Sequence, residues 1–336
     1  MTLEVVTFQN FTVFADARVE LCPGINVLIG TNGTGKSHAM KAMYALIGDE
    51  KKSAQSRKMT QVFLPEKGDV SRLVRRGKTE ARVGWRVEGK GRLFMVHQGG
   101  QLTSVLGEPG RWLPALYVPS REVLSMYEGF IAAYQSRELS FDETFFDLCV
   151  ALNANVLRGE RAEQIAPLLQ RLEAIIGGKV LLEGNRFYVQ PTNGDRVEAH
   201  LVAEGLRKIA TIARLVANGG IAPGGVLFWD EPETNLNPRL ITQVVDVLIE
   251  LARHGVQIVL ATHDYLLSHR LSLLAEYDKV PPGTVRFFGL ARSEPDGPVT
   301  VSRGDTLADL PSNPIVEEFA RHYDFERELF DHSQGG

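Results

Sequence analysis

A glycine-rich loop between a short apolar run and a helical segment constrains the fold of this chain more than any other feature. Residues 25–29 read Ile-Asn-Val-Leu-Ile, residues 30–37 read Gly-Thr-Asn-Gly-Thr-Gly-Lys-Ser, and residues 36–47 have the composition of a helix. An apolar run of this length that ends at a turn signal is typical of a buried strand. The order strand, glycine loop, helix therefore predicts an α/β fold built on a buried, largely parallel sheet.

The residue types in this loop suit the binding of phosphate, and the loop is a complete G-x-x-x-x-G-K-S match. Glycines let the backbone turn its N–H groups inward, and the helix N-terminus adds a positive dipole end. Lys36 would neutralise the β- and γ-phosphates, and Ser37 would offer a hydroxyl to Mg²⁺. The expected nucleotide-binding residues are Asn32, Gly33, Thr34, Gly35, Lys36, Ser37 and His38.

Two further apolar runs end in polar residues that could meet the loop. Residues 226–229 read Val-Leu-Phe-Trp and lead into Asp230 and Glu231, and residues 256–261 lead into Thr262-His263-Asp264. Ligands of open α/β sheets bind at the carboxyl ends of the strands. We therefore expect Asp230 to hold Mg²⁺, Glu231 to polarise the attacking water, and His263 to contact a γ-phosphate from the neighbouring strand. Lys36, Glu231 and His263 are the predicted catalytic residues.

The composition is that of a folded cytoplasmic protein. Hydrophobic residues make up 44% of the 336 residues and charged residues 23%, which excludes wholesale disorder. No apolar run approaches the roughly 18–20 residues of a membrane span, so we expect no membrane association. Two cysteines, Cys22 and Cys149, are too few for a disulfide framework and indicate a reducing cytosol.

Charge is unevenly distributed along the chain. Residues Lys51 to Arg92 hold 13 Lys or Arg against 4 Asp or Glu, whereas residues Gly304 to Gly336 hold 8 acidic residues and 2 basic ones. A basic segment of this kind could bind nucleic acid or the acidic tail of a second copy. A solvated β surface explains it equally well, and the sequence leaves these alternatives open.

Apolar spacing predicts the remaining elements. Strands are expected at residues 4–8, 13–21, 115–118, 285–290 and 299–302, with antiparallel strands between residues 70 and 96. A polar loop is expected at 51–57, a hairpin at 179–190, and helices between 122 and 172 and at 201–217, 239–254, 265–277 and from 315 onward.

The opening segment and the string Asp-Glu-Pro-Glu-Thr-Asn-Leu-Asn-Pro at 230–238 resemble the ATPase heads of the ABC class. Within that class they are similar to the soluble branch, which includes SMC-like, RecF-like and overcoming-lysogenisation-defect (OLD) ATPases. The 230–238 string is most similar to OLD-like bacterial ATPases, which often serve in phage-defence or restriction operons. The resemblance covers residues 1–49 and 201–290. It implies one P-loop NTPase head over residues 1–336, with a mixed central sheet, an antiparallel β-lobe at about 55–115, a helical lobe at about 121–200 and an acidic tail at about 304–336.

The resemblance also assigns roles by position. Glu231 corresponds to the catalytic glutamate, His263 to the switch histidine, and Asn235 lies in the D-loop. Ala203, Glu204 and Gly205 occupy the signature motif, but Ala203 and Glu204 replace its serine and first glycine. Ser120 replaces the glutamine of the Q-loop, where its hydroxyl could bind a Mg²⁺-bound water.

Heads of this class bind two ATP molecules between two copies, so the resemblance implies a Mg²⁺-dependent ATPase that dimerises around ATP, with higher oligomers open. We expect turnover to be slow, because Ala203 removes a hydroxyl donor. The leading hypothesis is an ATPase that regulates a separate effector, a nuclease or toxin, in anti-phage defence, since the 72 residues after Asp264 hold the end of the sheet and leave no room for a Toprim nuclease domain.

The alternative is a RecF- or SMC-like DNA-repair or DNA-clamp ATPase whose segment Lys51–Arg92 contacts DNA phosphates. Two further hypotheses are a nucleotide-binding subunit of a membrane transporter and a structural protein that uses ATP only for assembly.

Overall fold

A six-stranded sheet carries the glycine-rich loop in the computed structural model, which describes residues 1–334 except 48–51, 100–101, 108–112, 293 and 295–296. The strand order is β14-β13-β3-β12-β11-β7. Its strands are β3 (Ile25–Ile29), β7 (Ala115–Val118), β11 (Val226–Asp230), β12 (Gln257–Thr262), β13 (Val285–Arg292) and β14 (Val299–Gly304). All neighbours pair in parallel except β14, which pairs antiparallel with β13. Every residue of β3 and β12 is buried, as expected where both faces of a parallel sheet are covered.

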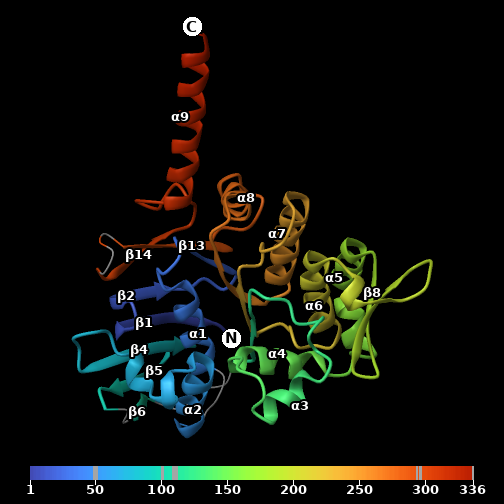
Figure 1. Cartoon of the computed structure of the whole chain (residues 1–336), viewed down its shortest axis with the longest axis horizontal. Coiled ribbons are helices and arrows are strands. Elements are labelled where there is room, and N and C mark those ends of the chain that lie inside the picture. The colour runs from blue at the N-terminus through green and yellow to red at the C-terminus, as the bar shows by residue number, and fades with distance from the viewer. Residues whose placement is uncertain (48–51, 100–101, 108–112, 293, 295–296, 335–336) are drawn as a thin grey trace.

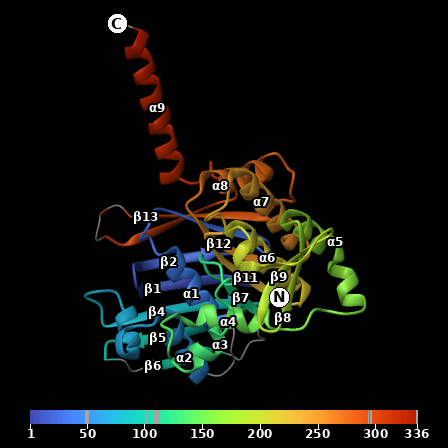
Figure 2. The same cartoon turned by 45° about the vertical axis from the view of Figure 1, so that its right-hand side comes forward.

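An antiparallel sheet and one helix cover the first face of this central sheet (Figures 1 and 2). The sheet has the order β2-β1-β4-β5-β6. Its strands are β1 (Leu3–Phe11), β2 (Phe14–Glu20), β4 (Glu80–Val87), β5 (Lys90–His97) and β6 (Leu102–Gly107). Helix α1 (Lys36–Ile47) packs between the two sheets and is buried along most of its length. The helix that follows the glycine loop is therefore fixed on both sides.

Helices cover the opposite face of the central sheet. They are α6 (Glu204–Ala217), α7 (Pro238–Arg253) and α8 (Tyr265–Glu276), which share one apolar core with the alternate side chains of β3, β11 and β12. The same core extends to α3 (Phe130–Gln135), α4 (Glu143–Leu152), α5 (Glu160–Ile176) and the small sheet of β8 (Gly178–Glu183), β9 (Arg186–Pro191) and β10 (Val197–Glu198). The last helix, α9 (Pro314–Gln334), projects from the end of the molecule opposite β4, β5 and β6 (Figures 1 and 2).

Most predicted elements are confirmed, including the hairpin at 179–190 and the helix after residue 315. The helices expected between 122 and 172 are present from Phe130 onward, whereas residues 122–129 form turns. Every helix in the described part of the chain is too short or too polar to span a lipid bilayer.

Two predictions in the basic segment are wrong. Helix α2 (Lys52–Phe63) replaces the loop expected at 51–57. The segment is helical because Met59 and Val62 are fully buried against the core. Lys51 lies outside the described residues. The expected strand from residue 70 is a short 3₁₀ helix (Val70–Leu73), and β4 begins only at Glu80. The antiparallel sheet also includes β1 and β2, so the expected β-lobe at 55–115 supplies only three of its five strands.

Candidate functional site

The glycine-rich loop turns sharply from β3 into α1, with φ of 80° at Gly33 and 88° at Gly35. A Cβ atom on Gly35 would lie 2.5 Å from Cγ2 of Val13, so both the backbone angle and the space require glycine. The Lys36 ammonium donates hydrogen bonds to the carbonyls of Gly30 (2.6 Å) and Thr31 (3.1 Å). Burial lowers the pKa of Lys36, although the nearby acidic side chains oppose this shift. The lysine is thus held across the loop, where it can meet a phosphate.

Asp230 ends β11 beside this loop. The Tyr117 hydroxyl of the neighbouring strand β7 donates a hydrogen bond to Asp230 Oδ2 (3.0 Å). Burial raises the pKa of Asp230, and hydrogen bonds from Ser37 and Tyr117 partly offset the rise. Asp230 Oδ1 is buried without a hydrogen-bond partner among the described residues. A buried carboxylate oxygen without a donor, next to a serine hydroxyl, fits the oxygen ligands that Mg²⁺ prefers, so Ser37 and Asp230 could hold the ion.

Glu231 and His263 face each other from the ends of adjacent strands. His263 Nδ1 lies 3.3 Å from Glu231 Oε1, and the Thr234 hydroxyl lies 3.3 Å from Glu231 Oε2. Glu231 has a positive φ of 46°, a left-handed conformation that costs a non-glycine residue about 1–3 kcal/mol. The side chain of His263 is half-exposed, so this pair lies at an edge that a substrate can reach.

Sequence reasoning missed two buried charges behind this pair. Glu233 accepts a hydrogen bond from the Thr262 hydroxyl (2.7 Å), and burial raises the pKa of Glu233. Lys208 of α6 donates to the carbonyl of Glu231 (3.3 Å), and burial lowers the pKa of Lys208. The sequence holds only weak signals for these two residues. Lys208 interrupts the apolar spacing of 201–217, and Glu233 is a second glutamate in the string 230–238.

Two other supporting residues were also missed. Arg292, at the end of β13, donates to the carbonyl of Gly33 (3.1 Å) and so braces the loop. Tyr117 lies within an apolar run that predicts a strand and gives no sign of the hydrogen bond to Asp230.

Residues Ala203–Gly205, the predicted signature segment, begin α6 and contact Asn235 of the predicted D-loop in the same chain. Asn235 Nδ2 donates to Glu204 Oε1 (2.6 Å), and a Cβ on Gly205 would lie 2.9 Å from the carbonyl oxygen of Asn235. Ala203 occupies the N-cap position and makes no side-chain capping bond. The segment and the D-loop therefore form one continuous surface.

The two remaining predicted residues lie at the borders of this region. Ser120 follows β7 by two residues, at the same sheet edge as Asp230 and Glu231. The ring of His38 packs against Phe63 of α2 with 5.7 Å between ring centroids.

Comparisons with known proteins agree with this geometry. A family model described as "AAA ATPase domain" matches residues 1–81, and one described as "AAA domain, putative AbiEii toxin, Type IV TA system" matches residues 103–268. The SMC head domain from Thermotoga maritima superimposes with a TM-score of 0.54 at 14% identity, over 90% of this chain and 99% of that one. The fold is that of an SMC-type P-loop ATPase head.

Two more SMC heads superimpose on this head over nearly the full length of both chains. One is an SmcHead bound to the C-winged helix domain of ScpA, with a TM-score of 0.60, 13% identity and coverage of 91% and 98%. The other is an Smc head with an extended coiled coil bound to the C-terminal domain of ScpA derived from Pyrococcus furiosus, with a TM-score of 0.55, 12% identity and coverage of 97% and 99%. No curated protein sequence matches the chain.

The described cations of the basic segment Lys51–Arg92 are spread over several surfaces. Lys58 forms ion pairs with Asp147 and Glu143 of α4, so its charge is already matched. Arg75 donates to the carbonyl of Val13 (2.7 Å), and Arg72 forms an ion pair with Glu66. The excess positive charge of the segment Lys51–Arg92 therefore does not form one equally large basic patch on the described surface.

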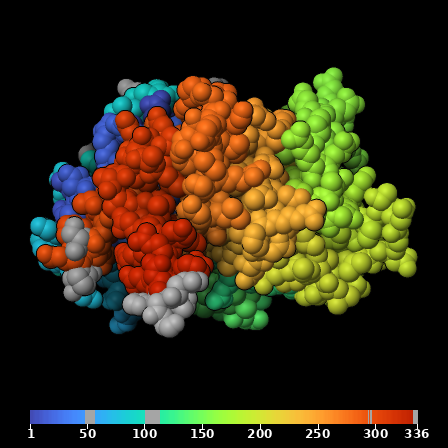
Figure 3. Space-filling model, turned by 90° about the horizontal axis from the view of Figure 1, so that it is seen from above, coloured from blue at the N-terminus to red at the C-terminus, as the bar shows by residue number. Residues whose placement is uncertain are grey.

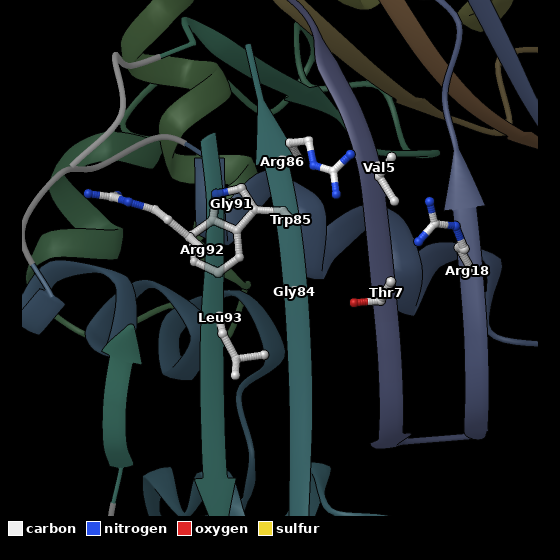
Figure 4. A pocket seen from close by; sticks show the side chains of 9 residues that line it. All are labelled: Val5, Thr7, Arg18, Gly84, Trp85, Arg86, Gly91, Arg92 and Leu93. Atoms are coloured by element: carbon white, nitrogen blue, oxygen red, sulfur yellow. The ribbon is translucent and has the colours of Figure 1, made fainter. Parts of the chain in front are cut away.

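A hollow on the outer face of the antiparallel sheet does gather arginines of the head. It has a volume of about 370 Å³, and Gly84 and Gly91 contribute to its lining without side chains. Figure 4 shows Arg18 and Arg86 on either side of Val5, whereas Arg92 extends away from them. Arg18 is also paired with Glu20 (2.8 Å). This hollow is an anion-binding candidate separate from the P-loop edge.

Proposed function

We propose that this chain binds and hydrolyses Mg²⁺-ATP at the carboxyl edge of β3, β11 and β12. The observation that carries the proposal is the convergence of Lys36, Asp230 and the Glu231–His263 pair, which come from separate segments of the chain. Mg²⁺ bound by Ser37 and Asp230 would neutralise the charge that develops on the phosphates.

The residues divide the reaction between them. Glu231 would orient a water and take its proton as the water oxygen bonds to the γ-phosphorus and the bond to the ADP oxygen breaks. His263, held by Glu231 through Nδ1, would donate from Nε2 to a γ-phosphate oxygen. Lys36 would balance the charge on the β- and γ-phosphates. The left-handed backbone of Glu231 would help to orient its carboxylate before substrate arrives.

A second copy would complete the site. The segment Ala203–Gly205 at the start of α6 would face the phosphates bound by the other copy, with Asn235 beside it. Since Ala203 has no hydroxyl, contact with the γ-phosphate would come from backbone N–H groups at the helix N-terminus. Turnover would therefore be slow, with ATP serving first to hold two copies together.

The test is steady-state ATP hydrolysis by purified protein. Lys36→Ala should abolish nucleotide binding, and Glu231→Gln should keep binding but lose turnover by roughly 100-fold or more. Glu183→Gln, the same chemical change on the exposed hairpin strand β8, is the matched control and should hydrolyse ATP like the parent. Hydrolysis by Glu231→Gln at the parental rate would refute the assignment.

We propose a cellular role in anti-phage defence, supported by the resemblance to OLD-like ATPases and by the toxin–antitoxin wording of one matched family model. In this role the ATPase regulates a separate nuclease or toxin during phage infection. A strain that carries the gene with its neighbouring open reading frames should resist phage, and Glu231→Gln should remove the protection. Equal plating of phage on strains with and without the genes would contradict the role.

A DNA-linked ATPase of the RecF or SMC kind is the second candidate, and the hollow between Arg18 and Arg86 favours it. Duplex DNA should then stimulate hydrolysis in a salt-sensitive way. Arg86→Glu should remove the stimulation, whereas Lys78→Glu, an exposed cation elsewhere in the basic segment, should keep it. An ATP hydrolysis rate that is the same with and without duplex DNA would exclude this candidate.

A further inference from the structure

Helix α9 exposes an unusual number of large apolar side chains. Val316, Phe319, Tyr323, Phe325, Leu329 and Phe330 are between 37% and 66% exposed, and they are six of the thirteen exposed large hydrophobic residues in the described part of the chain. Asn313 caps the helix by accepting from the N–H of Ile315 (3.1 Å), and Pro314 occupies its first turn. The start of the helix is therefore well defined, while its length is exposed to water.

These apolar side chains share one half of the helix. At 3.6 residues per turn, residues 316, 319, 323, 325 and 329 fall within about half of the circumference. The opposite half carries Glu317, Asp324, Glu328 and Asp331, whereas Glu318 and Glu326 lie among the apolar side chains. A helix with this division normally packs its apolar half against a partner, because isolated helices are marginal in water.

The base of α9 borders the proposed ATP site. Ile315, Phe319 and His322 line a groove of about 830 Å³ together with the P-loop residues Gly30–Asn32 and His263. Phe319 also contacts the ring of Tyr265 on α8, with 4.6 Å between centroids. Figure 3, seen from above, shows α9 (red) beside the α8 region (orange), and Figure 1 shows α9 projecting from this face. The apolar half of α9 is thus continuous with the edge that holds Lys36 and His263.

We propose that α9 is a docking arm for a second copy of this chain, packing its apolar half against that copy when ATP joins the two heads. The proposal rests on the proposed function, in which a second copy covers the P-loop edge. A two-fold axis through that edge would direct each α9 toward the other copy, so that each arm contributes the same contact. The 21 residues of α9 span about 32 Å, enough to reach across a neighbouring head.

The exposed apolar area suits this role. Aromatic side chains bury about 150–250 Å² each, so the partly exposed side chains of one α9 offer on the order of 500 Å². Two arms would together contribute about 1,000 Å², which is the area a specific protein interface needs. The acidic half of each helix would stay in water.

Sedimentation of the Glu231→Gln protein with ATP and Mg²⁺ tests the arm. In that background Phe325→Ser with Leu329→Ser should raise the dimer dissociation constant by roughly 10- to 100-fold. Asp324→Ser with Glu328→Ser changes the same turns on the opposite half and should leave the constant within about threefold. Binding of a fluorescent ATP analogue to the monomer should be unchanged in both variants.

The outcomes separate the two proposals. If both double variants dimerise like their parent, the arm is refuted while the ATP-dependent dimer stands. If the Glu231→Gln parent binds nucleotide and stays monomeric, the dimer of the proposed function fails, and the arm fails with it. A second measurement uses Leu329→Cys in the Glu231→Gln protein, since Cys22 and Cys149 are both buried. An environment-sensitive fluorophore on this cysteine should report a less polar surrounding when ATP and Mg²⁺ are added, and an unchanged emission in a protein that dimerises would also refute the arm.

Discussion

The Tyr117 hydroxyl allows a quantitative test of how the sheet edge prepares Asp230. Tyr117→Phe removes one hydroxyl and leaves the ring stacked on Phe228, with 6.3 Å between centroids. A hydrogen bond is worth about 1.5–3 kcal/mol to a charged group and about 0.5–1.5 kcal/mol between neutral groups, so the bond favours ionised Asp230 over the neutral carboxyl by about 1–1.5 kcal/mol. Losing the bond should therefore raise the pKa of Asp230. Since ionised Asp230 is the proposed Mg²⁺ ligand, the acidic limb of ATP hydrolysis should move to higher pH by about one pH unit, which corresponds to 1.36 kcal/mol.

The assay is ATP turnover at sub-saturating Mg²⁺ across the acidic and neutral range. Tyr44→Phe is the matched control, because Tyr44 is also a buried tyrosine in contact with Tyr117 but its hydroxyl bonds Asp147 instead. The control should lose some stability and keep the parental pH limb. If Tyr117→Phe leaves both the limb and the Mg²⁺ dependence unmoved, the hydroxyl does not position Asp230 and the reasoning fails.

Three further substitutions test the burial and strain at this edge. Asp230→Asn removes a charge that burial penalises, so the thermal unfolding midpoint of the nucleotide-free protein should rise by a few degrees. The same variant should lose Mg²⁺-dependent ATP hydrolysis. A lower unfolding midpoint would contradict the burial argument. Burial raises the pKa of Glu233, so the folded state loses stability as the pH rises from the pKa of Glu233 in the unfolded chain through its pKa in the folded protein. Glu233→Gln should therefore leave the unfolding free energy unchanged in acid and increase it progressively toward neutral pH. The opposite trend would be inconsistent with a buried carboxylate. Gly35→Ala should abolish ATP binding and lower the unfolding free energy, measured in urea, more than Gly77→Ala does. Gly77 also has a positive φ but has open space where a Cβ would lie. Equal losses in the two variants would show that contact with Val13 does not matter.

The central sheet and the main site could be predicted because their signals are local. The apolar runs at 25–29 and 256–261 are buried on both faces, and the polar residues that end 226–229 and 256–261 meet because those strands are neighbours in the sheet. The glycine loop determined where α1 begins. In each case a few adjacent residues specify both the element and its edge.

The parts that could not be predicted depend on contacts between residues far apart in sequence. Helix α2 has a polar composition typical of a loop, and only tertiary packing of Met59 and Val62 makes it a helix. Strand β1 pairs with β4, so that Thr7 lies opposite Gly84, and no local pattern encodes that partner. The hydrogen bond from Tyr117 to Asp230 joins residues 113 positions apart and is invisible in an apolar strand pattern.

The central claim is that the P-loop edge binds ATP between two copies of this head. Sedimentation velocity of the Glu231→Gln protein, with and without ATP and Mg²⁺, tests it most directly. We predict a monomer without nucleotide and a dimer with ATP and Mg²⁺, with Lys36→Ala monomeric under both conditions. A Glu231→Gln protein that binds ATP and still sediments as a monomer would contradict the account.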